Sequence, residues 1–302
     1  MTVRVHEVGP RDGLQAESVP LSVETKLQFC EDLVNAGVDS IEVGSFVHPD
    51  WVPQMAQTEE LFVNLQGVDP GVRLTGLVLN RHGLDRASSV EIKSIAVFAS
   101  CTESFAIRNM NSSREESLNT ACLLASEAVG RGVEVRGYLS MCFGDPWEGR
   151  VDPQVVVSSA ERLLNAGCNT IAISDTIGVA GAGQVRSLLE RFHSKNFPID
   201  SLAAHFHDTY GQAIGNVAAC LEAGVAEFDS SASGLGRCPF APGATGNVAT
   251  EDLLWFLHTQ GFATTIDIAA VATASDAVDQ VLERSTTSAV KRALIASHLD
   301  EL

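Results

Sequence analysis

Basic residues are scarce in this sequence: 20 lysines and arginines stand against 38 aspartates and glutamates, for a formal net charge of −18 over 302 residues. A surface with that charge repels phosphate groups, which argues against nucleic acid and anionic membranes as partners. A negatively charged small substrate would need a local basic patch or a metal ion to overcome this field. Because 45% of the residues are hydrophobic, the chain can bury a sizeable core.

Paired cysteine motifs, signal segments and linkers are also missing. The seven cysteines include no Cys-x-x-Cys pair, which is typical of reduced, intracellular thiols. The first residues lack the apolar core of a signal peptide, and no apolar stretch approaches the length of a membrane span. We therefore expect a cytoplasmic protein without membrane attachment, with one domain over residues 1–302.

Strand-like and helix-like segments alternate along the chain. The expected strands are Val3–Val8, Ser40–Ser45, Arg73–Leu79, Ser94–Ala99, Val133–Leu139, Thr170–Ser174, Leu202–His207 and Glu227–Ser231. The expected helices are Val23–Ala36, Gln57–Leu65, Leu84–Val90, Arg114–Gly130, Pro153–Ala166, Gln184–Lys195, Gln212–Ala223 and Thr250–Gln260. This repeat predicts an α/β protein with a closed parallel TIM (β/α)8 barrel, and two additional C-terminal helices at about 267–283 and 285–297.

The positions of four glycines also favour a barrel. Expected helices end at Gly37, Gly132, Gly167 and Gly224, and glycine readily takes the left-handed conformation that closes a helix. The alternative fold is an open doubly wound sheet, which would carry a glycine-rich phosphate-binding turn after its first strand. The segment Gly9–Gly13 does not have that spacing, so the barrel is favoured.

Polar residues gather at the ends of the expected strands, where a barrel of this kind places its active site. His205 and His207 end the seventh strand, and their spacing puts both imidazoles on one face. Asp12 follows the first strand, and Asn247 follows the eighth. One carboxylate, two imidazoles and an amide carbonyl suit a divalent cation with open water positions. Without thiolate pairs, Mg²⁺ or Mn²⁺ is favoured over structural zinc.

Other residues at the same rim have more than one interpretation. Arg11, beside Asp12, would place a fixed cation where an enolate oxygen develops. Glu42 and Asp175 either contact the substrate or the metal ligands, or neutralise Arg11 and Arg136 inside the rim. Candidate substrate contacts are Gln15, Tyr138 and Thr176.

Cys238 lies in a glycine-rich stretch after the eighth strand, and it also has two interpretations. It is either a small buried residue, as we expect for the other six cysteines, or an exposed thiol that transfers a proton to a carbanion. Arg237 beside it would favour the thiolate.

Taken together, these segments resemble the 3-hydroxy-3-methylglutaryl-CoA lyase family of the DRE-TIM metallolyases. The resemblance covers nearly the whole barrel and is carried by the segments Glu7–Gln15, Ser45–Met55, Asp175–Val179, His205–Gln212 and Gly234–Leu253. It implies a retro-Claisen lyase that releases acetyl-CoA and acetoacetate and takes part in leucine degradation. It also implies an acyl-CoA substrate and specific residue roles. We further expect a homo-oligomer, specifically a dimer. The implied metal ligands are Asp12, His205, His207 and Asn247, and the resemblance implies active-site roles for Arg11, Glu42 and Cys238. We add His205 and Asp175 as candidate catalytic residues.

The chain departs from the family pattern at two places. Arg237 stands where the family usually has glycine, and His48-Pro49-Asp50 stands where it often has Ser-Pro-Lys. The second departure leaves related substrates open, such as citramalyl-CoA or a longer branched 3-hydroxyglutaryl-CoA. Two further hypotheses are a Claisen-type synthase, disfavoured because the chain ends soon after the barrel, and a barrel that only binds a ligand. The sequence does not locate the cations that meet the CoA phosphates, for which Arg108 and Lys291 are two candidates.

Overall fold

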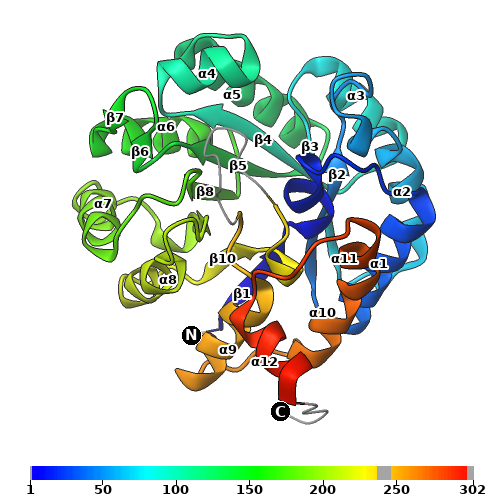
Figure 1. The fold of residues 1–302 in the computed structure, drawn as a ribbon. Coiled ribbons are helices and arrows are strands. Elements are labelled where there is room, and N and C mark those ends of the chain that lie inside the picture. The colour runs from blue at the N-terminus through cyan, green and yellow to red at the C-terminus, as the bar shows by residue number, and fades with distance from the viewer. Residues whose placement is uncertain (1, 237–245, 298–302) are drawn as a thin grey trace.

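The computed structural model describes residues 2–236 and 246–297, and parallel strands within them close into a barrel (Figure 1). Neighbouring strands follow the order β1, β2, β3, β4, β5, β8, β9 and β10, and β10 pairs with β1 to close the ring. Their bounds are β1 Arg4–Glu7, β2 Ser40–Ser45, β3 Arg73–Leu77, β4 Ser94–Ser100, β5 Glu134–Ser140, β8 Thr170–Asp175, β9 Leu202–Phe206 and β10 Glu227–Ser230. The predicted TIM barrel is confirmed.

Helices surround the barrel on its outside (Figure 1). The expected ones are α1 Val23–Asn35, α2 Thr58–Asn64, α3 Arg81–Ser89, α5 Arg114–Gly130, α6 Pro153–Asn165, α7 Ala182–Ser194, α8 Ala213–Glu222 and α9 Thr250–Thr259. Elements that were not expected are the short helix α4, Glu103–Met110, and the hairpin of β6, Gly144–Asp145, with β7, Gly149–Arg150. The N-cap of α4, Thr102, makes no side-chain capping bond, so the sequence carries little signal for this helix.

The C-terminal helices differ from the expectation. The single helix expected at about 267–283 is wrong, because α10 spans Ile268–Ala274, Ser275 lies between the two helices, and α11 runs from Asp276 to Val281. The hydroxyl of Ser275 donates to the carbonyl of Ala272 and accepts from the ammonium of Lys291. Such side-chain bonds compete with the helical ladder. The last helix, α12, spans Ala289–Ser297 and so begins later than expected.

Local sequence signals account for the barrel. Gly37, Gly132, Gly167 and Gly224 all have positive φ angles, as predicted for residues that end helices. Every residue of β2 is buried, as in parallel sheets that are covered on both faces. The main apolar core accordingly lies between the strands and the surrounding helices.

After β1 the chain forms a π-helical turn, η1, at Gly9–Gly13. Turns of this type are rare in proteins, and those that occur often lie at functional sites. This one places Arg11 and Asp12 at the rim formed by the carboxyl ends of the strands. None of the helices within residues 2–236 and 246–297 combines the length and the apolar character that a membrane span needs.

Candidate active site

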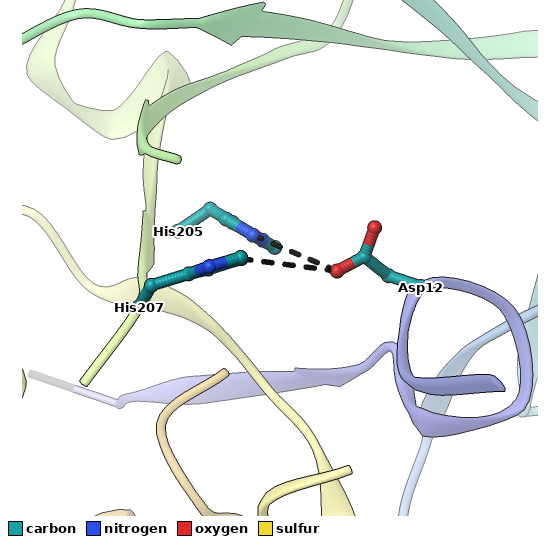
Figure 2. A group of neighbouring side chains, drawn as sticks. All are labelled: Asp12, His205 and His207. Atoms are coloured by element: carbon teal, nitrogen blue, oxygen red, sulfur yellow. Dashed lines mark ion pairs between the residues drawn. The ribbon is translucent and has the colours of Figure 1, made fainter. Parts of the chain in front are cut away.

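Asp12, His205 and His207 meet at the carboxyl end of the barrel (Figure 2). The carboxylate comes from η1, His205 lies on β9 and His207 directly follows that strand, and both imidazoles point towards the carboxylate (Figure 2). Nε2 of each histidine lies 4.0 Å from Oδ2 of Asp12. These separations are too long for hydrogen bonds, but two ligands that are each about 2.1 Å from one ion are separated by roughly 3–4 Å. The three side chains therefore fit a shared metal ion.

Asn247, the fourth metal ligand expected from the sequence, lies beside Asp12. Its backbone pairs with that of His207, and its Nδ2 donates to Oδ2 of Asp12 at 2.9 Å. The same Nδ2 donates to the carbonyl of Leu235 at 3.1 Å. Because the amide nitrogen serves both acceptors, the amide oxygen remains for a cation.

The two histidines lie in different electrostatic environments. Burial alone would lower the pKa of His205, but its hydrogen bond to Asp229 and the charges of Asp229 and Asp12 raise it overall. Burial and the neighbouring His205 lower the pKa of His207 to about 4. Its Nδ1 has no hydrogen-bond partner in the part of the chain that the structure describes. Neutral imidazoles bind metals, so His207 is held in the form that a cation requires.

Arg11 is fixed between two carboxylates. Its Nε donates to Oε2 of Glu42 at 2.6 Å, and its Nη1 donates to Oδ1 of Asp12 at 2.7 Å. The hydroxyl of Tyr138 also donates to Glu42, at 3.3 Å, and the Arg11 guanidinium lies over the Tyr138 ring. Although burial opposes it, the charge of Arg11 holds the pKa of Asp12 well below its usual range. Arg11 also lines the cavity that adjoins this cluster.

A cavity of about 930 Å³ opens from this centre. Its polar end is lined by Arg11, Asp12, His205 and His207, and by the predicted substrate contacts Gln15, Tyr138 and Thr176. Its other walls carry apolar side chains, among them Leu77, Leu79, Phe98, Phe105 and Leu124. The exposed side chains of His48 and Trp51 also line it, so the first residue of the unusual His48-Pro49-Asp50 segment belongs to the cavity lining.

Glu42 and Asp175 do not line this cavity, and the structure separates their two interpretations. Glu42 neutralises Arg11. Asp175 accepts from the backbone N–H groups of Val179 and Ala180, at 3.0 and 2.8 Å, and so holds the loop after β8. The idea that Asp175 neutralises Arg136 is wrong.

The actual partners of Arg136 are residues that sequence reasoning missed. Its guanidinium bonds to the carboxylates of Glu227 and Asp229, both on β10 across the barrel. Asp229 also accepts from Nδ1 of His205 at 3.1 Å. The spacing of Glu227 and Asp229 on an expected strand places both on one face, and this was the available signal.

Other predicted residues fall elsewhere. Cys238 and its neighbour Arg237 lie outside the described residues. Lys291, a candidate for the CoA phosphates, is buried and bonds to Asp276 and Asp279. Arg108 stacks on Trp147, with its guanidinium carbon 4.5 Å from the ring centroid.

The sequence and the structure were compared with those of known proteins. The HMGL-like family model matches residues 2–278. A 3-hydroxy-3-isohexenylglutaryl-CoA/hydroxy-methylglutaryl-CoA lyase of Pseudomonas aeruginosa is 46% identical over 294 residues, 97% of each chain. The crystal structure of a hydroxymethylglutaryl-CoA lyase from Pseudomonas aeruginosa superposes with a TM-score of 0.94, 45% identity and 98% coverage of each chain. An HMG-CoA lyase from Acinetobacter baumannii, solved with coenzyme A and 3-methylmalate, has a TM-score of 0.91 and 32% identity, covering 100% of this chain and 98% of that one.

Proposed function

Because the chain belongs to the HMGL-like family, we propose that it cleaves 3-hydroxy-3-methylglutaryl-CoA to acetyl-CoA and acetoacetate. The observation that carries this proposal is the cluster of Asp12, His205 and His207, with the guanidinium of Arg11 bonded to the same carboxylate. This arrangement suits a carbon–carbon lyase, which must remove a hydroxyl proton and stabilise an enolate. The names of the similar proteins, which are carbon–carbon lyases acting on such thioesters, support the proposal.

The cation would be Mg²⁺ or Mn²⁺, held by Asp12, His205, His207 and Asn247. When bound, such an ion polarises the tertiary hydroxyl and a carbonyl oxygen of the substrate. Oxygen and imidazole donors around one carboxylate fit these ions, and no thiolate among the described residues lies in the cluster. Each of these four side chains would thus bind the cation.

The residues of the chain would then carry the reaction. His205 or Asp12 accepts the proton of the tertiary hydroxyl, and the electron pair of that O–H bond forms the new ketone. The adjacent carbon–carbon bond breaks, and its electrons become the enolate of acetyl-CoA. Arg11 donates to the enolate oxygen, in the orientation that Glu42 fixes. Cys238 supplies the proton that converts the enolate carbon to the methyl group.

Further residues hold the substrate in place. Gln15, Tyr138 and Thr176 line the cavity beside the metal centre and would contact the acyl group. Asp175 fixes the loop that follows Thr176 and so acts as a positioning residue. We further propose one domain, a cytoplasmic location and a homodimer.

A longer branched acyl group is a second candidate substrate. The cavity walls include Leu77, Phe98, Phe105 and Leu124, which suit an apolar substituent on the tertiary carbon. The name of the Pseudomonas aeruginosa relative includes 3-hydroxy-3-isohexenylglutaryl-CoA beside the methyl compound. This apolar wall also favours longer branched groups over the short polar chain of citramalyl-CoA.

Acetyl-CoA release from a panel of 3-hydroxyacyl-CoA thioesters tests the proposal. We expect turnover of the methylglutaryl thioester with Mg²⁺ or Mn²⁺, and its loss in EDTA. His207→Ala should lose metal affinity and activity together, whereas His205→Ala should lose more turnover than metal affinity because His205 also moves a proton. His193→Ala, an exposed histidine on α7, is the matched control. Full activity in both site variants, or turnover that EDTA does not change, would contradict the proposed site.

A further inference from the structure

One strained turn lies beside the metal centre. The turn η5, Ala232–Gly234, follows β10, and within it Ser233 has a φ angle of 60°. That left-handed conformation is uncommon for a residue with a side chain, and it persists only where the surroundings impose it. Ser233 is fully buried, so its surroundings are protein.

Three segments that follow the barrel bind Ser233. Its N–H donates to both carboxylate oxygens of Glu251 on α9, each at 3.0 Å. Its Oγ donates to Asp279 of α11 at 2.6 Å. Its carbonyl oxygen accepts from the N–H of Thr287 and from the hydroxyl of Thr286, each at 3.2 Å. The nitrogen, the oxygen and the hydroxyl of one residue are therefore each held by a different C-terminal segment.

Buried charges fix these segments to one another. Asp279 accepts from Nζ of Lys291 on α12 at 3.0 Å and from Nη1 of Arg284 at 3.0 Å. Nη2 of Arg284 reaches the carbonyl of Gly234 in the same turn. Lys291 and Asp279 are both buried, so breaking one partner would leave an unpaired charge in the interior. These charged groups therefore hold α11, α12 and the turn η5 together.

The turn leads directly to a metal ligand. Leu235, the next residue after η5, offers its carbonyl to Nδ2 of Asn247 at 3.1 Å. The following Gly236 packs against the same amide, since a Cβ atom there would lie 2.7 Å from Nδ2 of Asn247. A shift of the turn would therefore rotate or displace the amide that is proposed to bind the cation.

We propose that Ser233 and Asp279 are positioning residues for the metal centre. Glu251 of α9, Asp279 of α11 and the segment 286–287 hold Ser233 in its left-handed conformation, which fixes the carbonyl of Leu235 and through it the amide of Asn247. This inference rests on the metal site of the proposed function. It assigns the helices after the barrel a role in the reaction centre as well as in the fold.

Mn²⁺ binding to the metal-free protein tests the inference without an activity assay. Free Mn²⁺ is measured by electron paramagnetic resonance at fixed pH for the wild type, Ser233→Ala and Asp279→Asn. Both variants should bind Mn²⁺ roughly 10-fold more weakly, the lower end of the effect of removing residues that support metal ligands. The spectrum of bound Mn²⁺ should also change, because the geometry of Asn247 changes.

Ser288→Ala is the matched control. The hydroxyl of Ser288 is buried and bonds to Asp252 at 2.7 Å, so its loss loosens the attachment of α12 without removing a bond to Ser233. Its Mn²⁺ affinity should equal that of the wild type. If Ser233→Ala does not fold, Ser233→Gly replaces it, because glycine takes a φ of 60° without strain and also lacks the hydroxyl.

The outcomes separate this inference from the proposed function. Wild-type affinity and an unchanged spectrum in folded Ser233 and Asp279 variants would overturn the positioning role and leave the metal site intact. An equal loss in Ser288→Ala would also overturn it, because general loosening of α12 would then explain the effect. A wild-type protein that does not bind Mn²⁺ would instead overturn the proposed metal site.

Discussion

Asp229 joins the metal centre to the charged interior of the barrel: its Oδ2 accepts from Nδ1 of His205 at 3.1 Å, while its Oδ1 is bonded to Arg136. A proton on Nδ1 leaves Nε2 as the basic nitrogen of His205. Nε2 is the atom that faces Asp12. The carboxylate thus selects the histidine tautomer that a cation needs.

Asp229→Asn should weaken metal binding by about 10–100-fold. Arg136 will hold the amide oxygen of the new asparagine, so the amide NH₂ will face His205 and donate to Nδ1. The proton of the imidazole then moves to Nε2, which blocks the metal-binding lone pair. Calorimetric titration of the metal-free protein with Mn²⁺ measures the effect. Glu227→Gln is the matched control, since Glu227 also bonds to Arg136 but not to His205. Equal affinities in both variants would contradict the tautomer argument.

The positions of the four expected ligands followed from one general rule. Parallel barrel strands end at the same rim, so Asp12, His205, His207 and Asn247 could be placed together without knowing a single contact. The fold followed from the alternation of apolar runs with helical segments closed by glycines such as Gly37 and Gly224. Both inferences use periodicity, which is visible in the sequence.

Contacts across the barrel could not be predicted in the same way. Asp229 lies 93 residues from Arg136 in the sequence, and the strand pattern does not show which inward-facing side chains meet. The burial of Lys291 could not be predicted either. A lysine in an amphipathic helix is normally exposed, whereas this one is buried against Asp279. Which charges pair in the interior depends on packing, and the sequence carries no periodic signal for it.

Arg11→Met should lower kcat by roughly 10²–10³, with a smaller change in KM. The reason is that its proposed hydrogen bond forms to a charge that develops only in the transition state. The substitution also leaves Glu42 buried without its partner, which costs about 3–5 kcal/mol of stability. Steady-state kinetics and chemical unfolding measure the two effects separately.

The double variant Arg11→Met with Glu42→Gln separates these effects. Removing the charge of Glu42 should restore much of the lost stability, because no unpaired buried carboxylate remains. It should not restore kcat. Recovery of kcat in the stable double variant would show that Arg11 serves only as the structural partner of Glu42.

Stability should fall as the pH rises from about 6.5, the ordinary pKa of histidine, to 8, because below 6.5 the buried neutral His6 and His207 oppose the effect of two buried glutamates. Burial raises the pKa of Glu251 to about 8 and that of Glu7 to about 7, despite hydrogen bonds that oppose the shift. In this window the folded protein retains protons that the unfolded chain has released, so deprotonation favours unfolding. Each such group contributes at most about 1.4 kcal/mol per pH unit. Urea unfolding across this range measures the slope.

Glu251→Gln should flatten that slope, because the amide is neutral at every pH and still accepts from the N–H of Ser233. Glu190→Gln, at an exposed position on α7, should leave it unchanged. A slope that is the same in the wild type and in Glu251→Gln would mean that Glu251 does not hold its proton in the folded protein.

Brief alkylation should label Cys238 faster than the other six cysteines. Of those six, Cys122 is half-buried, and the rest are buried. Burial raises the pKa of Cys30 and of Cys168 to about 12, which leaves almost no thiolate at neutral pH. Arg237, the neighbour of Cys238 in the sequence, would favour the thiolate, so Arg237→Gly should slow the labelling of Cys238. Peptide mapping after a short exposure to iodoacetamide identifies the modified residue, and bound product should protect it.

The proton-transfer role of Cys238 is tested by Cys238→Ser. A hydroxyl is a far weaker acid than a thiol, so this variant should lose most turnover while its Mn²⁺ affinity stays at the wild-type value. Cys122→Ser, which changes the most accessible of the other six thiols, should remain active. A fully active Cys238→Ser, together with a Cys238 that resists alkylation, would assign the enolate's proton to another donor.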